Sequence, residues 1–173
     1  GTNGSGKSTL LKILAGILTP NSGVITANQK IITSLISSNE RSFYWRLTAE
    51  QNLMFFSSLN GENKQISRLK IHSLGEALDT IKFLDTPFML LSSGQRKRLM
   101  IQRALMKEPN LILCDEITAN LDNESNENVT SLLKEYSISR GVSLMWVSHS
   151  KEEINAICNK KALLIDGKLN VQK

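Results

Sequence analysis

Apolar residues recur with two different periods along this chain, and the two periods predict a mixture of helices and strands. A repeat of three to four residues predicts amphipathic helices over residues 8–18, 48–59, 73–84, 94–106, 123–137 and 151–158. Short β-branched or apolar runs predict strands over residues 24–26, 31–36, 111–114, 143–147, 162–165 and 169–171. Asp166-Gly167 between the last two runs is a strong signal for a tight hairpin. Strands that alternate with helices predict an α/β fold with a mainly parallel sheet flanked by helices.

The middle of the chain departs from this alternation. Three helical patterns follow one another there, so we expect a helical lobe over about residues 45–105, inserted into the sheet domain. No internal repeat or low-complexity linker separates one part of the chain from another. Residues 1–173 are therefore expected to form a single domain, and a chain of 173 residues with 40% hydrophobic residues can bury a core of its own.

Charge and cysteine usage narrow the partners and the compartment. The formal net charge of +5 suits an anionic ligand or a membrane surface, but the charge is too mild and dispersed to predict direct contact with nucleic acid. The two cysteines, Cys114 and Cys158, lack the spacing of a metal site, and Cys114 stands in an apolar run. A buried, reduced thiol is the expectation for Cys114, and a reducing cytosol fits both cysteines.

The chain opens with a pattern that binds phosphate groups. The P-loop pattern is matched in full by Gly1, Thr2, Asn3, Gly4, Ser5, Gly6, Lys7, Ser8 and Thr9. Glycines let backbone N–H groups converge on phosphate oxygens, and the helix that follows adds its unpaired N–H groups. Lys7 can reach the β- and γ-phosphates, while the Ser8 hydroxyl can bind Mg²⁺. The dinucleotide-binding fingerprint fits poorly, because Thr9 stands where that pattern has its third glycine.

A P-loop connects a strand to a helix, yet here the loop's first glycine is residue 1. The strand that positions the loop is not in the sequence. We expect this chain to be a fragment of a longer one that lacks its N-terminal strand or strands.

Two acidic residues and a histidine follow predicted strands further along. Asp115 and Glu116 come directly after the apolar run 111–114, and His149 follows the run 143–147. Ligand sites in open α/β sheets lie at the carboxyl ends of the strands, so these side chains are expected to face the P-loop. Asp115 would help to hold Mg²⁺, Glu116 would position and polarise the attacking water, and His149 would donate to the γ-phosphate. These residues predict a ligand with β- and γ-phosphates, bound together with Mg²⁺.

Taken together, these motifs resemble the ABC ATPase family over essentially the whole chain. The decisive stretch is Leu91-Ser92-Ser93-Gly94-Gln95, which looks like the family's signature motif, and Leu121-Asp122 looks like its D-loop. The resemblance implies a head-to-tail dimer in which each ATP lies between the P-loop of one subunit and the signature helix of the other. Further ATP contacts are then implied for Ser92, Ser93, Gly94 and Gln95, and a D-loop role for Asp122.

Three positions differ from the family pattern. Asn39 stands near the usual Q-loop glutamine; it keeps an amide oxygen for Mg²⁺ but is one methylene shorter. Ser93 replaces a common glycine of the signature, and Ile117 replaces the proline that usually follows the acidic pair. These changes spare the catalytic groups, so we still expect hydrolysis.

An aromatic and basic segment covers residues 41–48, in the region that faces the membrane subunit in transporters of this family. It concentrates three aromatic residues and two arginines in a chain with only 5% aromatic residues. Such residues are typical interface anchors, and packing at the base of the helical lobe is the alternative. The order Arg46-Leu47-Thr48 resembles the exporters of the family more than the importers.

The predicted function is ATP hydrolysis by the motor subunit of an exporter-type ABC transporter. The resemblance implies a second ATPase subunit and an integral membrane permease as partners, with the chain peripheral on the cytoplasmic face of the membrane. A soluble ABC ATPase acting on ribosomes or DNA is the alternative, but the chain shows no basic tract and no second cassette. A GTPase is excluded because Ala162 ends the stretch Asn159-Lys160-Lys161-Ala162, where the guanine-reading motif requires aspartate.

Overall fold

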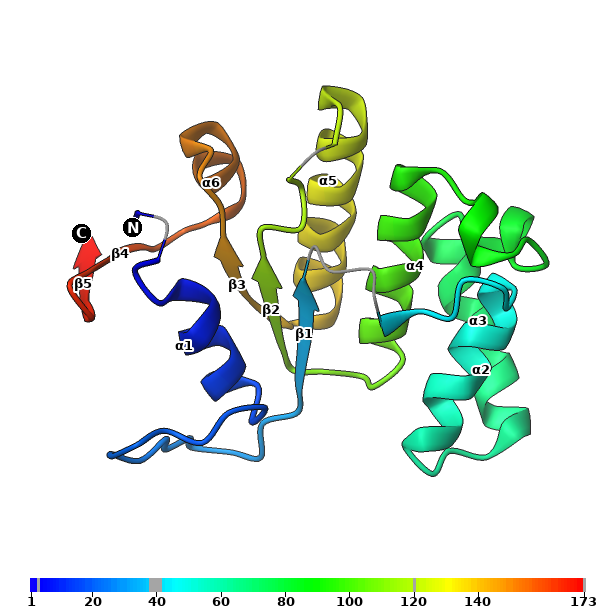
Figure 1. Cartoon of the computed structure of the whole chain (residues 1–173), viewed down its shortest axis with the longest axis horizontal. Helices are drawn as coiled ribbons and strands as arrows, with labels where there is room; N and C mark the ends of the chain where they lie inside the picture. The colour runs from blue at the N-terminus through cyan, green and yellow to red at the C-terminus, as the bar shows by residue number, and fades with distance from the viewer. Residues whose placement is uncertain (3, 38–41, 120, 173) are drawn as a thin grey trace.

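A parallel sheet forms the centre of the computed structural model, which describes residues 1–2, 4–37, 42–119 and 121–172. Its strands are β1 (Thr33–Ser37), β2 (Leu111–Asp115) and β3 (Ser143–Val147), in the order β1-β2-β3 (Figure 1). The register aligns Ser37, Asp115 and Val147, so the three carboxyl ends lie side by side. The predicted α/β fold with a parallel sheet is confirmed, and the apolar run of β2 is buried because it is the middle strand.

Helices cover both faces of this sheet. In Figure 1, α1 (Lys7–Leu14) lies on one face and α5 (Asn123–Arg140) on the other, and α6 (Lys151–Ile157) follows β3. The first helix is shorter than the periodicity predicts, since it ends at Leu14 rather than at residue 18. Gly16 adopts a left-handed φ of 71°, and its N–H closes the last turn on the Ile13 carbonyl. A glycine in this conformation is a common helix stop, so the apolar periodicity beyond it was misleading.

The middle of the chain forms helices on the right of Figure 1. They are α2 (Ala49–Leu59), α3 (Lys64–Ala77), the short 3₁₀ turns η2 (Ile81–Phe83) and η3 (Phe88–Leu90), and α4 (Ser93–Leu105). The predicted helix over 73–84 is misplaced. The Asn63 side chain accepts a hydrogen bond from Gln65 N at 2.8 Å and starts α3 at Lys64, while Asp79, with φ 53°, interrupts the helical backbone after Ala77.

The C-terminal segment forms the predicted hairpin. β4 (Lys161–Ile165) pairs antiparallel with β5 (Lys168–Gln172), and both turn residues have positive φ, 47° for Asp166 and 72° for Gly167. A two-residue turn of this kind matches the right-handed twist of the strands.

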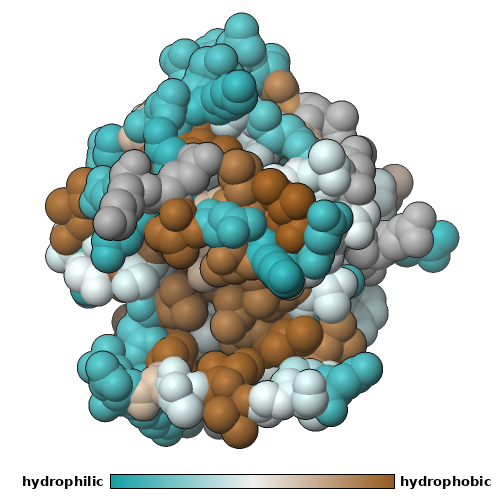
Figure 2. All heavy atoms as spheres, turned by 90° about the vertical axis from the view of Figure 1, so that its left-hand side faces the viewer, coloured by the Kyte–Doolittle hydropathy of each residue, from teal (hydrophilic) through white to brown (hydrophobic). Residues whose placement is uncertain are grey.

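The strand predicted over 24–26 does not form. Val24 is 87% exposed, and in the described part of the chain no neighbouring strand offers hydrogen bonds to this segment. Exposed aliphatic side chains from residues 17–32 and from β4 and β5 gather on the same side of the molecule, which Figure 2 shows as a hollowed apolar face. A β-branched run needs a pairing edge to become a strand, and pairing cannot be read from the run itself.

Among the described residues, no helix combines the length and the apolar character that crossing a bilayer requires.

Candidate active site

The glycine-rich loop forms a turn that leads directly into α1. Gly4 and Gly6 have φ values of 78° and 97°, which side chains other than glycine tolerate poorly. The Leu10 N–H reaches back to the Gly6 carbonyl at 2.9 Å and closes the first helical turn. The N–H groups of that first turn have no partner further back in the helix, so they can bind an anion. The predicted ATP contact Asn3 lies outside the described residues.

Lys7 folds over the loop that precedes it. Its Nζ donates to the carbonyl oxygens of Gly1 and Thr2, each at 2.9 Å. These bonds hold the ammonium group over the loop, where a phosphate oxygen would be a stronger acceptor than a carbonyl. The Ser5 hydroxyl is also buried, with no hydrogen-bond partner among the described residues. The loop therefore presents a cation, a hydroxyl and backbone donors around one small region.

Gly1 packs against the backbone of β4, and we expect Gly1→Ala to displace the loop. An alanine Cβ there would lie 2.2 Å from the Leu164 carbonyl oxygen, a backbone atom that cannot rotate away. Such overlap costs on the order of 1–3 kcal/mol, so the free energy of unfolding and the ATP affinity should both fall. Denaturant unfolding and nucleotide titration measure the two effects. Thr19→Ala, at an exposed position outside the loop, is the control, and an unchanged Gly1→Ala variant would refute this packing.

The candidate catalytic residues meet at the carboxyl ends of β2 and β3. The Nε2 of His149 lies 2.9 Å from Oε1 of Glu116, and the Glu116 N–H donates to the Val147 carbonyl at 3.0 Å. An ionised carboxylate only accepts hydrogen bonds, so in this pair the histidine nitrogen is the donor. The side chains are 36% and 48% exposed for Glu116 and His149, which leaves both open to a ligand.

Glu116 has an unusual backbone conformation, with a φ of 50°. Left-handed backbone is strained for a residue with a long side chain, and such strain is often found at functional sites. A proline after Glu116 would restrict its backbone further, but Ile117 stands there and its side chain is 1% exposed. At this position the chain therefore has a buried isoleucine side chain in place of the rigid proline ring of the family pattern.

The residues present fit a magnesium ion bound together with phosphate groups. Oδ1 of Asp115 is buried and has no hydrogen-bond partner in the described part of the chain, which is uncommon for a carboxylate oxygen. The same residues contain no group of three or more His, Cys, Asp or Glu side chains that could hold a metal by themselves. Mg²⁺ at phosphate-binding sites needs only one or two protein ligands, and Asp115 with Ser8 could supply them. The predicted ligand Asn39 lies outside the described residues.

The stretch that resembles the signature motif starts α4, far from the P-loop. Ser92 caps the helix by accepting from Gln95 N at 3.2 Å, and the Gln95 side chain accepts from Ser92 N at 2.9 Å. Ser93 is the first residue of α4 and is exposed, so the extra side chain clashes with nothing. Figure 1 places the N-terminus of α4 and the P-loop on opposite sides of the sheet. Within one chain, the structure does not bring Ser92–Gln95 and the P-loop together.

Asp122 likewise begins a helix. Its carboxylate accepts from the Ser125 N–H at 2.8 Å and from the Ser125 hydroxyl at 2.9 Å, which caps α5. These hydrogen bonds hold the pKa of Asp122 below its usual value. Helix capping is the role that this structure gives Asp122 by itself, and a D-loop contact would require a second chain.

Sequence reasoning missed two charged side chains beside the site. Glu153 follows Ser150 by three residues, a spacing that suggests a helix-capping pair, yet its carboxylate is buried and accepts from Trp146 Nε1 at 3.1 Å. Arg103 carries a guanidinium group that lies on the rings of Phe43 and Phe56. Neither position forms part of a recognisable motif, so only the fold could single them out.

A glycine-rich loop that leads into a helix, together with acidic residues at the end of a parallel strand, defines a P-loop nucleotide-binding protein. The model of the family described as ABC transporter matches residues 1–119, more than half of the chain. The chain belongs to the ABC transporter family, and it carries that family's ATP-binding domain.

Individual relatives agree with this assignment. The lipoprotein-releasing system ATP-binding protein LolD of Saccharophagus degradans is 34% identical over 99% of this chain and 81% of its own length. The glucose import ATP-binding protein GlcV of Saccharolobus solfataricus is 31% identical over 98% of this chain, which spans only 52% of that relative. A solved ABC transporter of metal-chelate type, in an inward-facing conformation, superimposes with a TM-score of 0.87 at 27% identity over 100% of this chain and 70% of the other.

Proposed function

We propose that this chain hydrolyses ATP to ADP and phosphate as the motor of an ABC transporter. The observation that carries the chemistry is the 2.9 Å contact between Glu116 and His149 at the ends of adjacent parallel strands. Those ends form the edge of the sheet where ligands of open α/β folds bind.

The roles follow from the chemistry of each group. Backbone N–H groups of the P-loop and the Lys7 ammonium bind the β- and γ-phosphates. Glu116 accepts a hydrogen bond from the attacking water and orients it, and His149 donates to the γ-phosphate. Mg²⁺, held by Ser8 and Asp115, would offset the negative charge of the phosphates. Asn39 is the third ligand that we propose, on sequence grounds alone.

Phosphate release from ATP, measured on the full chain, tests the enzymatic part. Release that stops when Mg²⁺ is chelated supports the proposal. ATP binding without release would reduce the chain to a nucleotide-binding module and overturn hydrolysis.

We further propose that two such domains enclose ATP head to tail. The P-loop and the Ser92–Gln95 helix start lie on opposite sides of one chain, so two chains related by a twofold axis could bring them together across two nucleotides (Figure 1). The N-terminus of α4 is a second end at which unpaired N–H groups can face phosphate. The partner can be a second copy of this chain or a related one.

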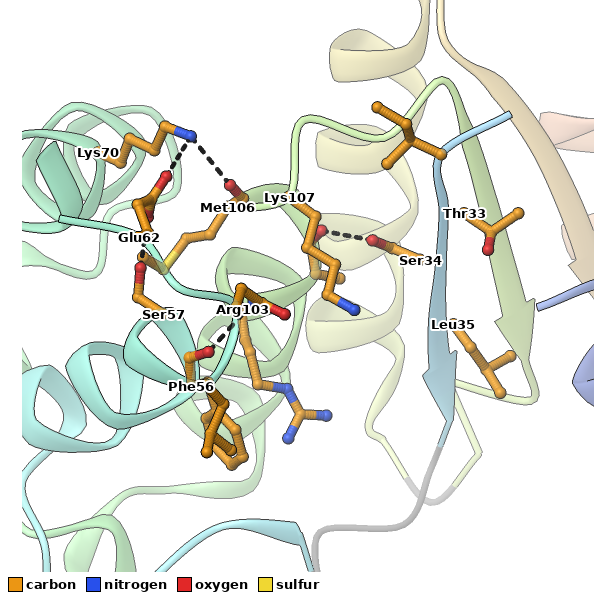
Figure 3. A pocket seen from close by; sticks show the side chains of 14 residues that line it. Thr33, Ser34, Leu35, Phe56, Ser57, Glu62, Lys70, Arg103, Met106 and Lys107 are labelled. Carbon is orange, nitrogen blue, oxygen red and sulfur yellow. Dashed lines mark hydrogen bonds and ion pairs between the residues drawn. The ribbon is translucent and has the colours of Figure 1, made fainter. Parts of the chain in front are cut away.

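A groove between the helices and the sheet is the proposed seat of a permease helix. It has a volume of about 580 Å³ and lies between β1 on one side and the ends of α2 and α4 on the other, as Figure 3 shows. Thr33 and Leu35 line the strand side, and Phe56 and Arg103 the helix side. The aromatic segment adjoins it through Phe43. Phe43 is buried, which matches the packing alternative, whereas Tyr44 and Trp45 are 50% and 47% exposed, as interface anchors would be.

Arg103 places a positively charged guanidinium group in this groove. Burial lowers its pKa to about 10, and its guanidinium lies 4.4 Å from the ring centre of Phe43 and 4.7 Å from that of Phe56. Among the described residues, its Nη1 donates to the Ser42 hydroxyl at 2.8 Å, and no described carboxylate forms an ion pair with it. A guanidinium has five donor hydrogens. A cytoplasmic helix of the permease with an acidic side chain would fit this site.

Arg103→Ala should therefore weaken binding of the membrane subunit by about 10-fold or more, as expected for a desolvated interface arginine. The Arg103→Lys variant should bind the membrane subunit with an affinity between those of the wild type and Arg103→Ala, because lysine keeps the charge but loses the planar contact with both rings. The measurement is recovery of membrane proteins with the tagged chain from solubilised membranes. Lys64→Ala, an exposed lysine at the start of α3 that does not line the groove, is the control. Recovery of ribosomes or nucleic acid without a membrane protein would instead favour the alternative function.

The remaining features of the proposal rest on sequence. We propose a single domain over residues 1–173 with its helical lobe at about 45–105, located on the cytoplasmic face of the membrane. Export is the direction that Arg46-Leu47-Thr48 favours, whereas the relatives named above include an import protein and a lipoprotein-releasing one. Transport assays in inside-out vesicles would decide the direction.

A further inference from the structure

Glu153, in the first turn of α6, is a buried carboxylate to which the proposed reaction assigns no role. Its residue is 7% exposed, and Oε2 accepts a hydrogen bond from Trp146 Nε1 at 3.1 Å. Its own N–H donates to the Ser150 hydroxyl at 3.1 Å. No described lysine, arginine or histidine forms an ion pair with it. A buried carboxylate without a positive partner is rare in proteins. A carboxylate held only by neutral donors therefore suggests a specific role for this residue.

Those donors come from separate elements around the candidate active site. Burial raises the pKa of Glu153, but hydrogen bonds from the side chains of Ser148, Thr118, Trp146 and Asn126 lower it overall. Ser148 directly precedes His149, Thr118 follows Glu116 by two residues, and Asn126 lies on α5. The Asn126 carbonyl oxygen accepts from the Thr130 hydroxyl at 3.1 Å, which leaves its NH₂ group to face the carboxylate.

We infer that Glu153 is a positioning residue that fixes the loop after β3 against that strand, so that His149 stays within reach of Glu116. This inference rests on the proposed function, since it concerns the placement of the two proposed catalytic groups. The loops contact each other directly through the bond from Glu116 N to the Val147 carbonyl, at 3.0 Å. Glu153 braces the loop after β3 from its far end, because its carboxylate accepts from Trp146 on β3 while its N–H donates to the Ser150 hydroxyl. The Ser150 N–H in turn donates to the Ser148 hydroxyl at 3.0 Å. Without the carboxylate, the segment that carries His149 could shift away from Glu116.

Glu153→Gln is the sharpest test, because it preserves the shape but replaces one acceptor oxygen with a donor. Trp146 Nε1 can only donate, and a neutral amide oxygen accepts its hydrogen bond more weakly than a carboxylate does. We expect kcat for ATP hydrolysis to fall about 10-fold or more, as small misplacements of catalytic groups do, while the dissociation constant for ATP changes less than about 2-fold. Glu153→Asp keeps the charge and should recover part of the loss.

The controls separate positioning from general destabilisation. Glu152→Gln changes the adjacent exposed acid, whose contact is the Ser150 hydroxyl at 2.9 Å, and should hydrolyse ATP normally. Leu133→Ala creates a cavity in the core and should lower the unfolding midpoint while kcat per folded molecule is retained. If Glu153→Gln does not fold, Trp146→Phe takes its place, because it removes the Nε1 donor to Glu153 and keeps an aromatic ring, with a kcat reduction of about 3-fold or more at unchanged ATP affinity.

The results of these assays separate this inference from the proposed function. A reduced kcat with unchanged ATP affinity, partly recovered by aspartate, supports the inference. Normal turnover of Glu153→Gln, or a reduction that Leu133→Ala reproduces at the same unfolding midpoint, overturns it while leaving the proposed function intact. A wild-type chain that binds but does not hydrolyse ATP would overturn the proposed function and this inference with it.

Discussion

Glu116→Gln should stop ATP turnover and leave ATP binding intact. Glutamine has nearly the same shape, but its neutral amide is a far weaker proton acceptor than a carboxylate, so the water that attacks the γ-phosphate loses its base. Positioned acid–base groups contribute about 10²–10⁴-fold to rates, and a decrease in kcat of that size is expected. Steady-state phosphate release gives kcat, and titration with a fluorescent nucleotide gives the dissociation constant.

In the presence of ATP, the same variant should form a stable dimer of two chains, because hydrolysis of the enclosed nucleotide is the step that allows the dimer to open. Size-exclusion chromatography with and without ATP measures this dimer. Stability should change little, since the Glu116–His149 pair is partly exposed and such pairs contribute only about 0–1 kcal/mol. Glu124→Gln, an exposed acid in the first turn of α5, is the matched control. Normal turnover of Glu116→Gln would remove Glu116 from its proposed role.

Lys7→Ala should abolish useful ATP affinity. The ammonium group offers charge-assisted hydrogen bonds to two phosphates, each of about 1.5–3 kcal/mol, and their loss corresponds to a decrease in affinity of about 100-fold or more. The variant also loses the two bonds from Nζ to the Gly1 and Thr2 carbonyls, so the loop itself becomes less ordered. Both effects act in the same direction on nucleotide binding.

Isothermal titration with ATP and with ADP measures this loss. The loss should be greater for ATP, because only ATP carries the γ-phosphate. Lys12→Ala, an exposed lysine in the last turn of the same helix, is the control for helix stability and net charge. Equal ATP affinity in Lys7→Ala and the wild type would refute the assignment of residues 1–9 as a phosphate-binding loop.

Local patterns in the sequence were sufficient for the central elements. The apolar run 111–114 became β2 almost residue for residue, because the middle strand of a parallel sheet must be apolar on both faces, and the run 143–147 became β3. Asp166-Gly167 specified the hairpin turn, since few residues tolerate positive φ at both positions. The P-loop was also predictable, because its function requires glycines at fixed positions in the chain.

Other boundaries depended on single residues that override periodicity. Gly16 ended α1 although apolar spacing continued to residue 18, and Asn63 started α3 well before the predicted position. The run 24–26 stayed unpaired because a strand exists only where another strand supplies hydrogen bonds. The residue types of a segment set its propensity for helix or strand, but the segments packed against it in the fold determine which of the two forms.

By itself, the sequence determined the nucleotide chemistry of this protein, because P-loop, acidic pair and histidine are each specified by residue types at fixed local spacing. Only the tertiary structure decided which distant residues act together. The parallel register of β2 and β3 placed Glu116 within 2.9 Å of His149. The packing of α2 against α4 put Arg103 onto Phe43 and Phe56, and α6 turned Glu153 inward against Trp146. Contacts between residues far apart in the chain arise from strand register and helix packing, which no local pattern of residues encodes.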